Sequence, residues 1–209
     1  MRLRAAFITM AAAGLLAVTA PAYAQGGAGS GGSTIVTPSL STAPVYGKDF
    51  PDPSVLYTGG QYVAYATGTG GLNLQMMTST DLLHWGTVAD PLLNLPTWAL
   101  PGWTWAPGVI PLGGKFVMYY TARDVLTDKQ CVGVATSTSA TGPFVGSSLT
   151  PLVCQTPGSI DPNPYIAPTG VPYLIWKSDD NSSGARTNLW SQRLSADGLS
   201  LIGSPSHLL

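Results

Sequence analysis

A short phrase built around a proline recurs along the chain and constrains its fold more than any other feature. The three copies occupy residues 52–56, 106–110 and 161–165, and each precedes an aromatic and aliphatic run. Their prolines, Pro53, Pro107 and Pro162, lie 54 and 55 residues apart. A phrase that returns at nearly constant spacing is typical of repeat architectures, so we expect structurally equivalent units.

Short runs with the composition of strands fill each unit. They are rich in Val, Tyr, Thr and Trp, and clusters of Gly, Pro, Asn and Asp separate them. The runs are residues 61–67, 72–78, 115–121, 132–137, 171–177 and 188–194. The last aromatic residue after the proline is Tyr65, Tyr119 and Trp176, at 12, 12 and 14 residues, which suggests a slightly longer turn in the third copy. We expect about four strands per unit.

The composition favours an all-β chain. The ten acidic residues are all aspartate, and the chain has 25 glycines and 18 prolines. Surface helices usually draw on glutamate, whereas Gly and Pro favour strands joined by turns. Units of about 40 to 50 residues with four strands each are typical of β-propeller blades. A β-sandwich with accidental internal similarity is the alternative.

The first residues have the pattern of a secretory signal peptide. Arg2 and Arg4 precede an apolar run over residues 5–20, and Ala22 and Ala24 supply the small residues of a cleavage site. A membrane anchor is the alternative, but the run is shorter than the roughly 20 apolar residues that a spanning helix needs. We expect cleavage after Ala24 and a secreted product, extracellular or periplasmic, without a membrane span.

The remaining chain is expected to form one incomplete domain behind a linker. The expected divisions are a signal peptide over 1–24, a Gly/Ser-rich linker over 25–44 and a partial propeller over 45–209, with blades near 45–100, 101–155 and 156–209. The formal net charge is −1, and no basic stripe is present that could neutralise a row of phosphates. Nucleic acid is therefore not expected as a partner.

Two cysteines, Cys131 and Cys154, are expected to form a disulfide in an oxidising compartment. Such a bridge would close a loop worth roughly 3 kcal/mol if its geometry is unstrained. Two buried thiols are the alternative.

Asp52 and Asp161 occupy the same place in two copies of the repeat, directly before the proline. Equivalent residues of propeller blades converge around the central channel, so both carboxylates are expected at the same mouth. Paired carboxylates can hydrolyse a glycoside, because one group protonates the leaving oxygen while another activates water or attacks carbon. The alternative is that Asp-Pro merely opens a turn.

Several phrases in a fixed order resemble one family. The phrases occupy residues 49–54, 79–85, 105–107, 130–137, 142–144, 159–162 and 173–178. Together they resemble the family 43 glycoside hydrolases, five-bladed β-propellers that act on arabinose- and xylose-containing polysaccharides. The resemblance covers the chain from about residue 49 to 178 and implies a glycosidase of the arabinofuranosidase, arabinanase or β-xylosidase kind.

The resemblance also implies roles for individual residues. Asp52 would be the general base that activates water, with inversion at the anomeric carbon. Asp161 would be a third carboxylate that orients the general acid and raises its pKa. Trp105, Ala106 and Trp176 would line the substrate pocket, although Trp105 could equally fill the core between blades. No metal or cofactor is expected.

Two departures from the family pattern matter. The family usually has an acidic residue directly after Trp-Ala-Pro, where this chain has Gly108. In the family the general acid is a glutamate of the fourth blade, and one more repeat period places it near position 216, beyond Leu209. We therefore expect three of five blades and an inactive fragment. A carbohydrate-binding propeller without catalysis and a protein-interaction propeller are the other candidate functions.

Overall fold

Ten strands and one short 3-10 helix make up the part of the chain that the structure, a computed structural model, describes: residues 43–146 and 148–209. The expected signal peptide and most of the expected linker lie outside this range. The elements are β1 (Ser54–Thr58), β2 (Gln61–Thr67), β3 (Leu74–Ser79), β4 (Ala99–Leu112), β5 (Lys115–Asp124), β6 (Gln130–Ser137), β7 (Ser159–Ile166), β8 (Pro172–Ser178), η1 (Asp179–Ser183), β9 (Leu189–Leu194) and β10 (Leu201–His207).

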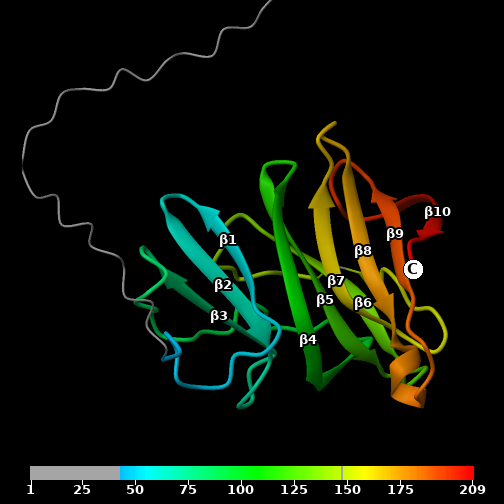
Figure 1. Ribbon diagram of the computed structural model, residues 1–209, viewed down its shortest axis with the longest axis horizontal. Coiled ribbons are helices and arrows are strands. Elements are labelled where there is room, and N and C mark those ends of the chain that lie inside the picture. The colour runs from blue at the N-terminus through cyan, green and yellow to red at the C-terminus, as the bar shows by residue number, and fades with distance from the viewer. Residues whose placement is uncertain (1–42, 147) are drawn as a thin grey trace, which may run out of the picture. The chain divides into compact units, whose positions relative to one another are not determined.

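The strands form three antiparallel sheets, one for each copy of the repeat. Their orders are β1-β2-β3, β4-β5-β6 and β7-β8-β9-β10, and the three sheets stand next to one another in chain order (Figure 1). The strand that follows or contains the proline phrase, β1, β4 or β7, is the first of each sheet and lies at its edge. β4 lies next to β1 on one side and β7 on the other. The all-β prediction is confirmed, and each sheet has the layout of a propeller blade.

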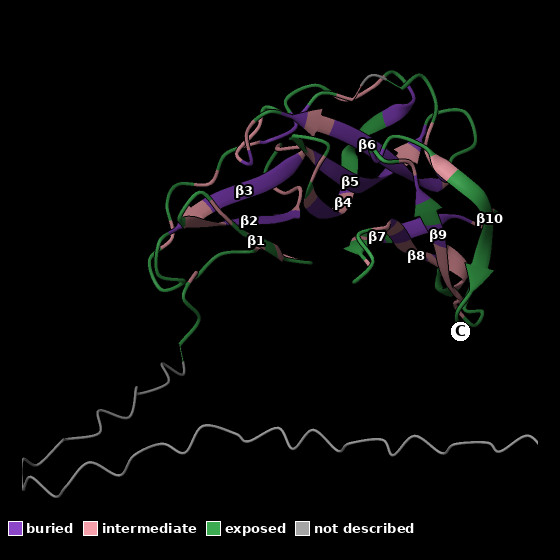
Figure 2. Ribbon diagram, turned by 90° about the horizontal axis from the view of Figure 1, so that it is seen from above, coloured by how far each residue is buried: buried purple, intermediate pink, exposed green. Residues whose placement is uncertain are grey.

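The fourth strand of a blade is complete only in the third sheet. There β10 pairs with β9, although it is almost entirely exposed, as its green colour in Figure 2 shows. In the first two sheets the described residues contribute only isolated bridges at this edge, Met76 to Ala89, Thr136 to Val145 and Val132 to Val153. Four strands per unit was therefore wrong for two of the three sheets.

The pairing of the first two strands differs from the sequence alignment by one residue in the third sheet. Ser54 pairs with Tyr65, Gly108 with Tyr119, and Asn163 with Ile175. The equivalent of Tyr65 and Tyr119 is therefore Ile175, and Trp176 is one position further on. Because side chains alternate along a strand, a shift of one residue moves a side chain to the other face of the sheet.

Apolar side chains fill the spaces on both sides of the middle sheet. One core joins the first and second sheets around Val63, Met118 and Phe144, and another joins the second and third around Val117 and Leu174. The strands β2, β3, β5 and β6 carry most of this burial (Figure 2). Burial of these faces against each other supplies the main stabilisation of the three-sheet stack.

A tyrosine hydroxyl in each of the first two sheets bonds to an outer turn of the next sheet. Tyr65 donates to the carbonyl of Ala140 at 2.5 Å, and Tyr119 donates to the carbonyl of Gly198 at 2.8 Å. Burial raises the pKa of both hydroxyls, so each remains a protonated donor. Equivalent tyrosine hydrogen bonds therefore connect the first sheet to the second and the second sheet to the third.

Cys131 on β6 and Cys154 form a disulfide, with their Cα atoms 4.6 Å apart. The bridge lies beside the pairing of Val132 with Val153, where the amide of Val132 donates to Val153 at 2.8 Å. The disulfide therefore fastens the segment after the second sheet to the outer strand of that sheet.

Candidate functional site

The residue before each repeat proline has a rare backbone conformation. Asp52, Ala106 and Asp161 have φ angles of 51°, 43° and 55°, in the left-handed region that residues other than glycine seldom adopt. At Ala106 and Asp161 the pairing with the next strand shifts register, as at a β-bulge. Such strain costs about 1–3 kcal/mol per residue and gathers at functional sites. The repeat therefore gives the two aspartates equivalent backbone settings in different sheets.

Asp52 is exposed, and a threonine holds one of its carboxylate oxygens. The hydroxyl of Thr67 donates to Asp52 Oδ2 at 2.6 Å and accepts the backbone N–H of Ala106 at 2.9 Å. Because that N–H occupies the hydroxyl as acceptor, the hydroxyl hydrogen is directed to Asp52. Oδ1 of Asp52 has no hydrogen-bond partner among residues 43–146 and 148–209, which leaves it free to receive a proton.

Asp161 has an equivalent setting but a different partner. Its backbone N–H donates to the hydroxyl of Thr121 at 3.0 Å, as the N–H of Ala106 does to Thr67. Its Oδ2 lies 3.3 Å from Nζ of Lys177. Lys177 pairs with Ile160, the residue before Asp161, and so occupies the strand position of Thr67 and Thr121. One aspartate therefore faces a neutral hydroxyl, and the other faces an ammonium group.

Asp179 adds a further carboxyl beside Asp161 and Lys177. Burial raises the pKa of Asp179 first, and the nearby charges of Asp161 and Asp180 raise it further, whereas Lys177 lowers it. Among the described residues no group of three or more His, Cys, Asp or Glu side chains has an arrangement that could hold a metal ion.

Trp105 and Ala106 lie between the two aspartates, on the strand of the middle sheet. Trp105 is half-buried and pairs directly with Thr121, whose hydroxyl bonds to Asp161. Close packing explains why Gly108 stands where the family usually has an acidic residue. A Cβ added there would lie 2.6 Å from Cδ of Pro164, so the close approach of the second and third sheets excludes a side chain.

Trp176 does not belong to this group, and the expectation that it lines a substrate pocket was wrong. Its indole is 1% exposed and lies in the core between the second and third sheets. Its Nε1 donates to Oε1 of Gln155 at 2.8 Å. The one-residue shift in pairing turns Trp176 toward the second sheet and leaves Ile175 and Lys177 on the opposite face.

Sequence reasoning missed the threonines and the lysine that contact the aspartates. Thr67 and Thr121 each stand 14 residues after the repeat proline, so the same self-comparison that found the aspartates could have found them. Lys177 carries no such signal, because the longer turn in the third copy displaces it from that spacing.

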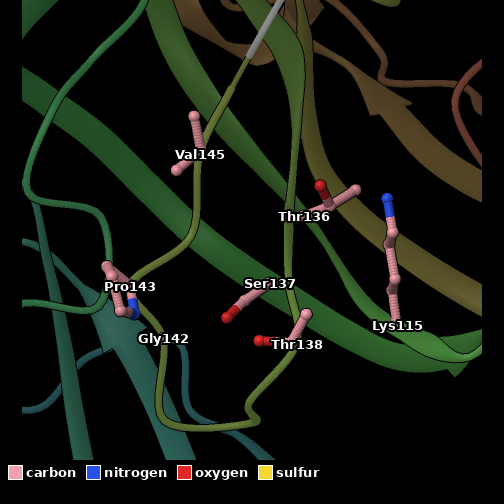
Figure 3. Close-up of a pocket in the computed structure, with 7 residues that line it drawn as sticks. All are labelled: Lys115, Thr136, Ser137, Thr138, Gly142, Pro143 and Val145. Carbon is pink, nitrogen blue, oxygen red and sulfur yellow. The ribbon is translucent and has the colours of Figure 1, made fainter.

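Two surface depressions are lined by residues other than Asp52 and Asp161. One depression is beside Thr67, lined by residues 68–73 together with Pro101 and Gly102. Another is lined by residues of β5, of β6 and of the segment that follows β6 (Figure 3). Its lining residues are Lys115, Thr136, Ser137, Thr138, Gly142, Pro143 and Val145. The candidate site rests on the aspartates and their partners, not on the outer depression.

Comparison with known proteins gives a consistent result. The sequence model described as Glycosyl hydrolases family 43 matches residues 41–209. An extracellular endo-alpha-(1->5)-L-arabinanase of Thermotoga petrophila is 29% identical over 109 residues, which cover 44% of this chain and 22% of that protein.

Two solved structures extend the comparison to the fold. A thermostable family-43 glycoside hydrolase is 28% identical with a TM-score of 0.68, over 77% of this chain and 53% of that one. An endo-1,4-beta-xylanase of Bacteroides thetaiotaomicron is 29% identical with a TM-score of 0.58, over 73% and 50%. The chain thus spans about half the length of these structures. The prediction that it forms part of a β-propeller of the five-bladed type is confirmed.

Proposed function

Because the chain belongs to family 43 of the glycosyl hydrolases, we propose that it supplies the water-activating part of a glycosidase for arabinose- or xylose-containing polysaccharides. The observation that carries the proposal is the equivalent setting of Asp52 and Asp161. Both have a left-handed backbone directly before a repeat proline. Asp52 lies two residues before β1 and Asp161 lies on β7, and these two strands flank β4. The similar proteins include an endo-alpha-(1->5)-L-arabinanase and an endo-1,4-beta-xylanase, which motivates the substrate class.

Asp52 is the general base in this proposal. Thr67 holds its Oδ2, so Oδ1 can take a proton from a water molecule that attacks the anomeric carbon. A water molecule between the base and the sugar reaches the face opposite the leaving group, so the product has inverted configuration. Asp161, paired with Lys177, carries no proton transfer itself and acts on the orientation and charge of the proton donor.

The proton donor for the leaving oxygen comes from a further blade in this proposal. The 209 residues contain no glutamate, and an extended enzyme would carry that residue on a blade that follows Leu209. By extended enzyme we mean this chain continued by two more blades from its own reading frame or from a close relative.

Hydrolysis by the extended enzyme tests the proposal. We expect it to release reducing sugar from arabinan or xylan, and we expect the 209-residue chain to be slower by about 10²–10⁴-fold, the usual contribution of general acid catalysis. Reducing-end assays on both polysaccharides measure this difference. Binding of these polysaccharides without hydrolysis by the extended enzyme would favour a carbohydrate-binding propeller instead.

Export is part of the same proposal, because a polysaccharide substrate lies outside the cell. The apolar run after Arg2 and Arg4 motivates it, and the similar protein of Thermotoga petrophila is described as extracellular. Within the described residues, no helix has the length and apolar character required to cross a membrane. N-terminal sequencing of the protein from the culture medium or the periplasm should begin at Gln25. Protein that stays in the cell with Met1 in place would refute export.

A further inference from the structure

An exposed indole, that of Trp103, lies on the same sheet as the candidate site. Trp103 is 40% exposed and stands two residues before Trp105, and the two ring centroids are 6.0 Å apart. Residues two apart on a strand face the same side of the sheet, and Trp105 pairs with Thr121, which bonds to Asp161. Trp103 therefore lies on the face of the second sheet that is turned toward Asp161.

An arginine holds this indole in place. Cζ of Arg123 lies 4.6 Å from the ring centroid of Trp103, within the range of a cation–π interaction. Arg123 is itself fixed, because Nε and Nη2 donate to the two oxygens of Asp128 at 2.6 Å and 2.7 Å. These two hydrogen bonds orient the guanidinium over the ring.

The turn that carries Asp128 is also tightly bonded. Asp128 has a φ of 58°, and its backbone N–H donates to the carbonyl of Asp124 at 2.9 Å. The carboxylate of Asp124 accepts both the N–H and the hydroxyl of Thr127. The bond to Arg123 lowers the pKa of Asp128, so the pair stays ionised at neutral pH. Both the side chain and the backbone of Asp128 are therefore held by hydrogen bonds, and Asp128 in turn holds Arg123 beside the indole.

The strand that carries Trp103 is anchored from its other face. The side chain of Thr104 donates to the carbonyl of Asn73, and the carbonyl of Thr104 accepts the N–H of Gly68 at 3.1 Å. Thr104 is buried against the first sheet, whereas Trp103 remains exposed. Both faces of this strand are therefore fixed before any ligand binds.

An exposed aromatic ring that is held in place can bind a sugar ring by packing against it. The C–H face of a pentose is apolar and packs on an indole, while its hydroxyl groups need donors and acceptors at the edge. Two of the five N–H donors of Arg123 are used by Asp128 in the described part of the chain, so the others can reach hydroxyl groups. The Arg123–Asp128 pair is neutral as a whole, which suits an uncharged ligand.

From this arrangement we propose that Trp103, held by Arg123 and Asp128, is a binding platform for one pentose ring of an oligosaccharide chain, next to the candidate catalytic residues. This inference rests on the proposed function for its ligand class. Trp103 takes no part in proton transfer and contributes affinity for a sugar unit beside the bond that is cleaved.

Binding to the 209-residue chain tests the platform without any need for turnover. Isothermal titration with α-(1→5)-linked arabinohexaose and with β-(1→4)-linked xylohexaose gives the affinity of wild type, and of Trp103→Ala and Trp103→Phe. We expect Trp103→Ala to bind about three- to tenfold more weakly, and Trp103→Phe to recover part of the loss because it restores a ring.

Tyr57→Ala is the matched control, because Tyr57 is an exposed aromatic residue at the far end of β1 from Asp52. It should bind as wild type does. Thermal melts of all variants should coincide, since Trp103 is not part of the core.

The outcomes separate this inference from the proposed function. Wild type that binds and Trp103→Ala that binds equally well would overturn the platform and leave the proposed function standing. A wild-type chain that binds neither oligosaccharide would overturn the platform, whereas hydrolysis by the extended enzyme decides the proposed function separately. An equal loss in Tyr57→Ala would show that the effect is not specific to Trp103, which also refutes the platform.

Discussion

Replacement of Asp52 by asparagine should reduce hydrolysis by the extended enzyme about 10²–10⁴-fold. An amide cannot accept the proton of the attacking water, whereas its shape and its bond from Thr67 are largely retained. The loss should be in kcat and should affect every substrate. Steady-state kinetics on aryl arabinofuranosides and xylosides measure it.

Azide provides the matching control for this variant. An inverting site leaves room for a small nucleophile between sugar and base, so added azide should partly restore cleavage and give a glycosyl azide of inverted configuration. Unchanged kinetics in Asp52→Asn would mean that the Asp-Pro phrase only opens a turn and that the catalytic assignment is wrong.

Variants of Thr67 and Thr121 distinguish loss of the hydrogen bond to Asp52 from a general loss of packing between the sheets. Thr67→Val removes the donor to Asp52 Oδ2, and hydrolysis should fall by about tenfold, as expected for loss of a hydrogen bond to a charged group. Thr121→Val removes the same hydroxyl in the next sheet, where it bonds to backbone and not to a carboxylate. A smaller effect at Thr121 would identify the contact with the carboxylate as the important one.

Replacement of Trp176 by alanine should cost roughly 3–5 kcal/mol of unfolding free energy, because the change leaves a large cavity in a closely packed core. The indole is 1% exposed and lies between the second and third sheets. The variant also leaves Oε1 of Gln155 without its donor. For a domain of this size the midpoint of thermal unfolding should fall by about 10 °C.

Trp103→Ala is the control for this prediction, since it removes the same side chain from an exposed position. Its unfolding free energy should change by less than about 1 kcal/mol. Urea denaturation followed by circular dichroism compares the two variants. Equal stability of Trp176→Ala and wild type would contradict the assignment of Trp176 to the core.

Local patterns in the sequence predicted the strands well, because strand propensity and turn residues act over a few positions. Residues 61–67 were predicted as a strand and form β2, and the other five runs coincide with strands to within a few residues. The exposed strand β10 was missed. Its sequence contains Gly203 and Pro205, and its stability comes from pairing with β9 rather than from its own propensity.

The equivalence of Asp52 and Asp161 also followed from the sequence, because both precede the repeat proline. The prediction that Trp176 lines a substrate pocket failed because of the pairing between β7 and β8. Counting from the proline assumed one turn length, but the third copy pairs Asn163 with Ile175, and a single added residue reverses the faces. The partners Lys177 and Arg123 could not be predicted, since their contacts depend on neighbouring strands brought together by the fold.

The hydrogen bonds of Tyr65 and Tyr119 to the next sheet affect the order in which the sheets can fold during synthesis. Tyr65 and its acceptor are 75 residues apart, and Tyr119 and its acceptor are 79 residues apart. Translation proceeds at roughly 5–20 residues per second, so each hydroxyl waits several seconds for its carbonyl to leave the ribosome. A nascent sheet therefore exposes an unpaired phenol and an apolar face until its successor emerges. Each sheet becomes complete only when the next one has been made, which gives the assembly a direction from the N-terminus onward.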